Sequence, residues 1–476
     1  MKINTENFIE SAEKELANPV SRSFLEFFLP VLSLVREVGL MTFLDKEAAI
    51  EKGKAIRKES VSRLGELLTE FEKNALENGA KIFWAKDADA ANNYIIDLIN
   101  DKKVLYVTKG KSMITEEIGL NDVLAQNGTD VYETDLGEFI IQLLNRPPFH
   151  IIGPAINIPP EEIRDVFMDK AGLKKPTTDP VELGYAARVF LRDKFHKMKL
   201  GITGVNMAIA DTGSILNVEN EGNIRFNKSS PEIQVSIMSL EKVVPTLEDA
   251  LHMTRILCRN GTGQKLTGYV TIDSGPRKEN ETDGPEELHI IILDNGRTGI
   301  YENLKTREVL QCIRCGACIN ICPVFRQVGG YPYGWVYTGP IGKLLNPLFL
   351  GLDRTKDLFG ACTLCKACKN VCPAGIDHPE MMLYFRNMDT EQDLILKGEG
   401  ASLKERLVAK AAAFAGRHAR VWNMAGDLAA KRLNSIVAKD KKGTPLDGWL
   451  KHRDFPEMPK ETFKKRYKNL DTDNQE

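Results

Sequence analysis

The sequence predicts an α/β domain with a mostly parallel sheet, followed by a mainly α-helical, cysteine-rich domain and a helical basic tail. Three observations carry this prediction. Short apolar segments alternate with helical segments between residues 61 and 300, a pattern typical of strand–helix–strand crossovers and a parallel sheet. Eight of the nine cysteines lie in two short runs after residue 310. The end of the chain contains alanine-rich amphipathic segments with many lysines and arginines.

The length of 476 residues suggests about three domains. We place them at 61–300, 301–390 and 391–476, after an N-terminal helical segment at 1–60. A net charge of −2 argues against a whole-chain role in binding nucleic acid. The N-terminus lacks the basic start of a signal peptide, and the apolar stretch 24–35 is too short to cross a bilayer. Free thiols indicate a reducing compartment, so we expect the cytoplasm.

The α/β domain is predicted from six apolar segments and four helices. We expect strands at residues 81–85, 103–108, 130–134, 150–154, 207–213 and 289–296. We expect helices at residues 91–99, 136–144, 184–195 and 247–257. Ligands of open parallel sheets bind outside the carboxyl ends of the strands. The loops after these strands are therefore the first places to expect a site.

Apolar residues recur at helical spacing within the first sixty residues. The stripe comprises Phe24, Phe27, Phe28, Leu32 and Val35. One interpretation is a helix that packs on the protein's own core. The other is a helix that docks onto a partner subunit.

Two lysines follow the second expected strand, in the stretch Lys109-Gly110-Lys111-Ser112. The stretch imitates the end of a phosphate-binding P-loop, but that motif requires glycine where this chain has Leu105. We therefore reject nucleotide hydrolysis. Backbone N–H groups together with Lys109 or Lys111 could still hold another anion. Alternatively, both lysines are solvated loop residues.

A second candidate ligand loop contains Asp211, Thr212 and Gly213. With Asp273 it imitates the aspartate pair of aspartic proteases. Those proteases have all-β lobes much longer than the interval between the two aspartates, so we reject this interpretation. Gly213 is expected to permit a sharp turn, while Asp211 and Thr212 tie the loop or face a ligand. Residues 219–223 are expected to form the turn of a hairpin.

The two cysteine runs share one spacing. Each reads C-x2-C-x2-C-x3-C-P, at residues 312–323 and 362–373, which is the bacterial pattern for [4Fe-4S] clusters. The fourth cysteine of such a run ligates the other cluster in two-cluster proteins. We therefore predict two [4Fe-4S] clusters. The first is held by Cys312, Cys315, Cys318 and Cys372, and the second by Cys362, Cys365, Cys368 and Cys322.

Zinc and disulfides explain the cysteine runs less well. A zinc site needs four ligands, and has no use for a third and a fourth cysteine in each of two identical runs. A disulfide framework belongs to short secreted chains. The ninth cysteine, Cys258, lies in a helical segment and is expected to be a small buried residue.

The order of these features resembles the lactate-utilization protein B family, which joins a LUD domain to a ferredoxin-type iron–sulfur domain. The stretches ADTGSI at 210–215 and EGNIRF at 221–226, ahead of the cysteine runs, carry the resemblance. It covers nearly the whole chain beyond about residue 60. It implies a subunit of a three-protein L-lactate oxidation system, working beside a second LUD protein and a cysteine-rich-domain iron–sulfur protein. It supplies no catalytic residue in the LUD domain.

The spacer between the cysteine runs is longer than in compact ferredoxins. It resembles the helical ferredoxin modules of succinate-dehydrogenase-type and heterodisulfide-reductase-type subunits. Its aromatic residues Tyr331, Tyr333, Trp335 and Tyr337 could screen a cluster from water. They could equally be ordinary packing.

The tail is strongly basic. Between residues 401 and 468, Lys and Arg outnumber Asp and Glu by 17 to 7. This segment is either a solvated basic face or a docking surface for an acidic partner.

These features indicate electron transfer. The chain has no GxGxxG fingerprint, so we expect it to bind neither NAD nor FAD. The favoured interpretation is an electron-relay subunit of an L-lactate oxidation complex, with the small 2-hydroxy acid bound wholly or partly on a partner. The alternative gives the LUD domain itself the binding or oxidation of a 2-hydroxy acid, lactate or glycolate, with the clusters as its electron acceptor.

Overall fold

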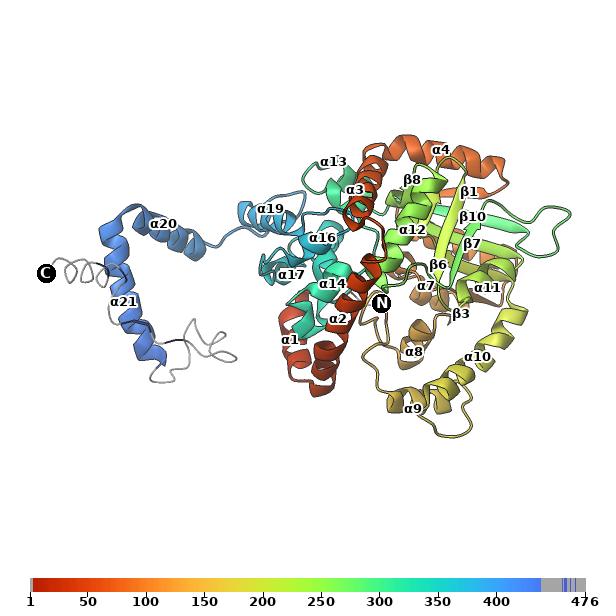
Figure 1. Cartoon of the computed structure of the whole chain (residues 1–476), viewed down its shortest axis with the longest axis horizontal. Coiled ribbons are helices and arrows are strands. Elements are labelled where there is room, and N and C mark those ends of the chain that lie inside the picture. Colours follow the sequence, from red (N-terminus) through yellow and green to blue (C-terminus); the bar gives the residue numbers. More distant parts are fainter. Residues whose placement is uncertain (1–2, 438–455, 457, 460–462, 464–466, 468–476) are drawn as a thin grey trace. The chain divides into compact units, whose positions relative to one another are not determined.

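The computed structural model describes residues 3–437 and, beyond them, residues 456, 458, 459, 463 and 467. The chain divides into two compact units, Met1–Glu399 and Gly400–Glu476 (Figure 1). The first unit contains both the α/β domain and the cysteine-rich domain, so these two domains share one body. Among the described helices, none combines the length and the hydrophobicity needed to cross a membrane.

A six-stranded parallel sheet forms the centre of the α/β domain (Figure 1). The strand order is β1-β10-β7-β4-β2-β3. The strands are β1 (Lys81–Ala85), β2 (Tyr106–Lys109), β3 (Asp130–Glu133), β4 (Leu200–Gly204), β7 (Ile233–Ser239) and β10 (Glu287–Leu293). This confirms the predicted α/β class with a parallel sheet. The analysis of the sequence missed β4 and β7, which are short or interrupted by glycine and serine.

Both faces of this sheet are buried. On β10, Ile291 and Leu293 pack into a core with α5, while Ile290 and Ile292 pack into a second core with α4. A strand covered on both faces has no polar face. This explains the unbroken apolar run at its centre.

A second, four-stranded sheet has the order β8-β5-β6-β9. Its strands are β5 (Met207–Ile209), β6 (Ser214–Glu219), β8 (Val243–Val244) and β9 (Tyr269–Asp273). Two predictions are wrong here and nearby. Residues 150–154 form bends and a turn instead of a strand. Residues 219–223 do not turn a hairpin, because helix α11 begins at Asn223, directly after Gly222 with φ of 78°.

All four predicted helices are present, as α5, α8, α10 and α12. Their N-termini are capped by the side chains of Asp87, Asp135, Asp179 and Thr246, which accept hydrogen bonds from first-turn N–H groups. The helices of the α/β domain are α4 (Leu64–Glu77), α5 (Ala88–Asp101), α6 (Met113–Glu117), α7 (Leu120–Gln126), α8 (Leu136–Leu144), α9 (Pro160–Lys170), α10 (Pro180–Lys197), α11 (Asn223–Ser229), α12 (Leu247–Gly261) and α13 (Arg297–Glu302).

The cysteine-rich domain is mainly helical, as predicted. Its helices are α14 (Ala317–Ile321), α15 (Phe325–Val328), α16 (Gly339–Leu350), α17 (Lys356–Gly360), α18 (Ala367–Val371) and α19 (His378–Glu391). The N-terminal helices are α1 (Phe8–Leu16), α2 (Pro19–Leu40) and α3 (Lys46–Ser62). Helices α1 and α2 pack alongside α14 and α15 of this domain (Figure 1).

The N-terminal stripe packs on the protein's own core, but with a different register from the predicted one. Leu25 and Leu29 of α2 are buried in the core of the cysteine-rich domain. Phe24 and Phe28 are half-buried, and their rings stack at a centroid distance of 5.1 Å. Phe27, which we expected in the buried stripe, is 72% exposed. The helix therefore keeps an apolar residue on its outer face.

The second unit is described over two helices, α20 (Leu403–Arg417) and α21 (Ala419–Val437). Ser402 and Glu405 form a reciprocal capping box at the start of α20. This confirms the helical character of the tail. Most of the basic segment beyond residue 437 lies outside the described residues.

Candidate functional site

The structure brings eight cysteines together in two groups of four. Burial raises the pKa of Cys318 well above its usual value, and the neighbouring Cys312, Cys315 and Cys372 raise it further. Burial also raises the pKa of Cys315 to about 12, with added contributions from Cys372 and Cys312. We call these four residues the inner thiol group.

The other four cysteines form the outer thiol group: Cys322, Cys362, Cys365 and Cys368. Burial, followed by the neighbouring Cys322 and Cys362, raises the pKa of Cys368 to about 12, and Cys365 contributes as well. The fourth cysteine of each run thus lies with the first three of the other run. This grouping of thiols is the one that the predicted cross-ligation of two clusters would require, and the ligation itself stays a prediction.

The two cysteine runs also share one backbone conformation. The peptide N–H groups of Arg314 and Leu364 each donate to the sulfur two residues earlier, Cys312 or Cys362, at 3.4 Å. Both donors have positive φ, 62° and 55°. The short helices α14 and α18 follow at equivalent positions and contact each other. Each run therefore wraps its first three thiols around one point.

The surroundings of the thiols fit an iron–sulfur cluster. Four thiolates per group are the ligand set of a [4Fe-4S] cluster, and hydrogen bonds to the sulfurs tune such clusters. The buried hydroxyl of Tyr333 has no hydrogen-bond partner among the described residues. Burial raises its pKa well above the usual value, and Cys322, Cys362 and Cys318 raise it further. A cluster sulfur would offer this hydroxyl the acceptor that it lacks.

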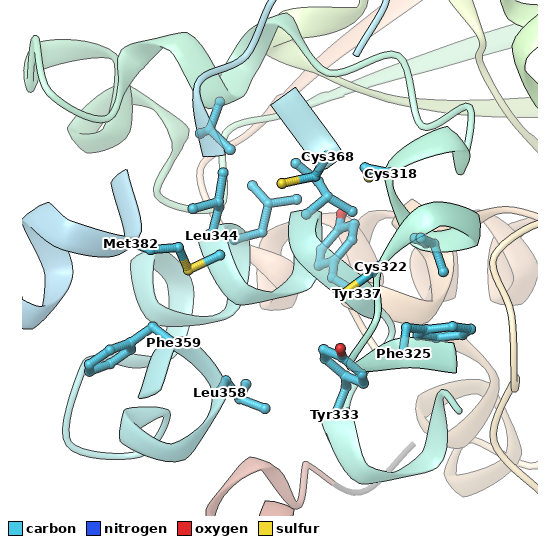
Figure 2. Packing of buried hydrophobic residues seen from close by; sticks show 14 of the residues in the cluster. Cys318, Cys322, Phe325, Tyr333, Tyr337, Leu344, Leu358, Phe359, Cys368 and Met382 are labelled. Atoms are coloured by element: carbon cyan, nitrogen blue, oxygen red, sulfur yellow. The ribbon is translucent and has the colours of Figure 1, made fainter. Parts of the chain in front are cut away.

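Aromatic and aliphatic side chains surround the thiols. Figure 2 shows Cys318, Cys322 and Cys368 in the core with the rings of Phe325 and Tyr333. Of the spacer aromatics, Tyr333, Trp335 and Tyr337 are thus buried in this core, and Tyr331 is partly buried against it. Tyr333 therefore packs the core, as one interpretation expected. Its position also suits the other interpretation, the screening of a cluster from water, which stays a prediction.

A cavity of about 340 Å³ lies next to the first cysteine run, which lines it through Arg314 and not through a cysteine. It lies at the carboxyl ends of β2, β4 and β7, where ligands of parallel sheets bind. Its α/β-domain lining includes Lys111, Ser112, Asn206, Asn217, Ser239 and Lys242. Arg314 and Tyr337 from the cysteine-rich domain also line it. The cavity therefore lies between the sheet and the first cysteine run.

A buried ionic network connects the two domains beside this cavity. Arg297 binds Glu117 through two nitrogen–oxygen contacts of 2.9 and 2.7 Å, and its Nε lies 3.0 Å from Glu241. Glu241 also accepts from Arg314 Nη2 at 3.2 Å, and Tyr337 donates its hydroxyl to Glu117. The two carboxylates thus balance the two guanidinium groups.

The structure places only one of the two predicted loop lysines at the cavity, and anion binding there stays a prediction. Lys111 lines the cavity, and its ammonium group donates to the carbonyl of Ile152 at 2.5 Å. Lys109 is neither solvated nor at the cavity. It is fully buried at the end of β2, 2.7 Å from Glu133 and 3.1 Å from Glu116, because a buried carboxylate requires a counter-charge.

The loop at Asp211, Thr212 and Gly213 is structural and does not line the cavity. Its carbonyls at Ala210 and Thr212 accept from the side chains of Asn74 and Asn78 on and just after α4. Asp211 accepts from the N–H of Leu247. Gly213 has φ of 63°, and a Cβ there would lie 2.3 Å from the backbone of α4. Only glycine allows this close approach.

The analysis of the sequence missed Lys242 and Arg314 as cavity residues. Lys242 follows β7, a strand that was not recognised. Arg314 lies inside the first cysteine run, where only the cysteine spacing was considered. The available signal was its position between the candidate ligands Cys312 and Cys315.

Three family models match the chain in order: the LUD domain over residues 68–293, the 4Fe-4S dicluster domain over 308–376, and Lactate utilisation protein B, C-terminal, over 384–471. The "Lactate utilization protein B" of Anoxybacillus flavithermus is 39% identical over 468 residues, which is 98% of each chain. The chain belongs to the lactate utilization protein B family. Residues 308–376 therefore form an iron–sulfur domain of this family.

Other members of the lactate utilization protein B family are similarly related. The "Lactate utilization protein B" of a Geobacillus species is 40% identical over 469 residues, covering 98% of this chain and 97% of its own. That of Bacillus cytotoxicus is 42% identical over 422 residues, covering 88% and 87%. The longer matches extend into the first sixty residues. We had expected that segment to fall outside the family, so this expectation is wrong.

Proposed function

We propose that this chain is the iron–sulfur electron-transfer subunit of a complex that oxidises L-lactate to pyruvate. In this proposal the inner and outer thiol groups hold two [4Fe-4S] clusters. One observation carries it: two four-thiol groups share one core, one beside the LUD-domain cavity and the other reaching the surface at the exposed Cys365. The names of the curated relatives support lactate as the metabolite.

The described residues suit a relay. Each cluster, when bound, accepts and releases one electron, while oxidation of lactate releases two. The eight thiols hold the iron, and the core around Phe325 and Tyr333 excludes water from it. The peptide N–H groups of Arg314 and Leu364 donate to ligand sulfurs, which stabilises the added negative charge of a reduced cluster. We place the protein in the cytoplasm, where thiols remain reduced.

The deciding experiment compares cysteine variants in the complete complex, prepared without oxygen. The wild type should show L-lactate-dependent dye reduction and about eight irons per chain. Cys315→Ala should abolish dye reduction and lower the iron content by about half, because Cys315 is an inner-group ligand. Cys258→Ala is the matched control, since this buried cysteine lies in α12, and should change neither value. Zinc in place of iron, or full activity of Cys315→Ala, would refute the proposal.

The proposed partners are a second LUD protein and a cysteine-rich-domain iron–sulfur protein. An apolar row on the outer face of α2 supports such assembly: Phe27, Val31, Leu34, Val38 and Met41, with Phe27 and Met41 each 72% exposed. The spacing places these residues on one helix face. Exposed apolar rows of this kind mark interaction sites.

Co-purification of the three proteins tests the α2 row. A Phe27→Ser/Leu34→Ser double variant should lose its partners and keep its iron. Leu105→Ser is the control, because Leu105 is 86% exposed but lies outside the row. Partner loss in the control as well, or full retention in the double variant, would contradict docking at α2.

A further inference from the structure

The cavity between the sheet and the inner thiol group carries two cationic groups with free binding capacity. The Arg314 side chain is only 10% exposed. Its Nη2 binds Glu241, but its Nη1 is buried without a hydrogen-bond partner among the described residues. A buried donor left unpaired costs about 1–3 kcal/mol. A ligand that accepts this hydrogen bond would recover that cost.

Lys242 provides the second cation. Its ammonium group makes no hydrogen bond or ion pair with any described residue. Burial, and after it the charge of Arg314, lowers the pKa of Lys242 to about 8. The group is therefore still mostly protonated at neutral pH. Glu117 and Glu241 already pair with Arg297 and Arg314. Among the described residues Lys242 therefore has no ion-pair partner of its own, although Glu241 favours its charged form from a longer distance.

A second set of cavity residues is acidic: Asp135, Glu219 and Glu221. Glu219 is held in place by the N–H groups of Ile224 and Arg225, each at 2.8 Å. Glu221 accepts from the N–H of Leu136 at 3.1 Å. Lys111 lies near this set but also donates to the carbonyl of Ile152. Burial, and after it the charge of Asp135, raises the pKa of Glu221 to about 7, so Glu221 is only partly ionised at neutral pH. The set still offers oxygen acceptors to a hydroxyl group, and its remaining negative charge repels a second carboxylate.

We infer that this cavity binds a small 2-hydroxy monocarboxylate, with its carboxylate against Lys242 and Arg314 and its hydroxyl end toward the acidic set. A cavity of about 340 Å³ admits a molecule of a few carbons. The cations supply the charge-assisted hydrogen bonds that a carboxylate requires. The acidic set disfavours dicarboxylates. The identity of the acid as lactate rests on the proposed function, but the binding does not.

The bound carboxylate would lie beside the inner thiol group. Arg314, which contacts the cavity, donates its peptide N–H to Cys312 Sγ at 3.4 Å. The Arg314 guanidinium thus lies on the same residue whose backbone contacts the inner thiol group, while its Nη2 atom binds Glu241 at 3.2 Å. A negative charge bound at the guanidinium would therefore lie close to the inner thiol group. By linkage, ligand binding and the redox state of the inner group affect each other.

Calorimetric titration of the full-length, cluster-loaded chain tests the inference. L-lactate should bind saturably, succinate and inorganic phosphate much more weakly. Lys242→Met should weaken lactate binding about ten- to a hundredfold, and Lys242→Arg should restore most of it. Lys343→Met is the matched control, because this buried lysine lies beside the outer thiol group and should leave lactate binding unchanged.

Two further readouts keep the test sharp if Lys242→Met does not fold. Glu221→Gln, at the exposed side of the acidic set, should improve succinate binding relative to lactate. Lactate should also alter the paramagnetic signal of the reduced inner cluster in wild type. Equal binding of lactate and succinate by wild type, or unchanged binding in Lys242→Met, would overturn the inference. Lactate binding without lactate-dependent dye reduction would instead contradict the proposed function and leave the site intact.

Discussion

The inner and outer thiol groups arise from the same motif but lie in different surroundings. Cys315 of the inner group is 8% exposed, whereas Cys365, at the same place in the second run, is exposed. Gly316 of the first run packs under Ile152 of the α/β domain, while the equivalent Lys366 is exposed. The packing of the α/β domain thus turns two equivalent sites into an internal one and a peripheral one. In the proposed relay, this difference favours a direction from the cavity to the surface.

The largest expected effect comes from removing one cysteine of the inner thiol group or, in a second variant, one cysteine of the outer thiol group. Cys318→Ala should eliminate the inner cluster and lactate-dependent dye reduction, because no other ligand reaches this buried position. Cys365→Ala should be milder, since solvent can occupy an exposed ligand position and three iron sites remain. Iron content and paramagnetic resonance of both variants measure the difference. A greater loss in Cys365→Ala would show that burial does not decide which cluster is essential.

Low pH should destabilise the fold around the inner thiol group, because it protonates His150 on unfolding. This side chain accepts the N–H of Ile152 and bonds Asn320 of α14 at 2.9 Å, and burial lowers its pKa to about 4. The unfolded chain, with a pKa of about 6.5, takes up the proton first as pH falls. Stability is therefore lost between about pH 6.5 and 4, by about 2 kcal/mol at pH 5.

Denaturant unfolding without oxygen, at pH 7 and pH 5, measures this loss. His150→Gln should be less stable than wild type at pH 7 but should lose less stability on acidification. The difference between the two proteins removes the contribution of groups that titrate in both. Parallel pH profiles would exclude His150 as the cause.

The smallest expected effect concerns the equivalent positions 316 and 366. Both have positive φ, 76° and 64°, but a Cβ at Gly316 would lie 2.9 Å from the Ile152 side chain. Gly316→Ala should cost about 1–2 kcal/mol, from left-handed strain and the displaced isoleucine. Lys366→Gly should be neutral or slightly stabilising, because the strain is relieved at an open position. Equal responses in thermal unfolding would mean that the α/β domain does not constrain the first run.

The sequence pattern predicted the structure correctly where the structure depends on neighbouring residues in the chain. The cysteine spacing predicted the short loop and the single helical turn that gather the first three thiols of each run. Helices with capped N-termini, such as α5 and α12, were recognised for the same reason. The position of each fourth thiol beside the other run also depends on the contact between α14 and α18. The two central strands β4 and β7 were missed, because their burial depends on neighbouring strands rather than on an alternating pattern. The role of Lys109 was missed because Glu133, its partner, is supplied by the adjacent strand.

By itself the sequence determined the candidate cluster cysteines, the parallel α/β architecture and the family. Each of these depends on spacing or periodicity within a few dozen residues. Only the tertiary structure decided that Arg314 and Lys242, more than seventy residues apart in the chain, face one cavity, and that one thiol group is internal while the other reaches the surface. These features depend on packing between distant segments, where burial and unpaired charge arise from contacts that no local pattern encodes.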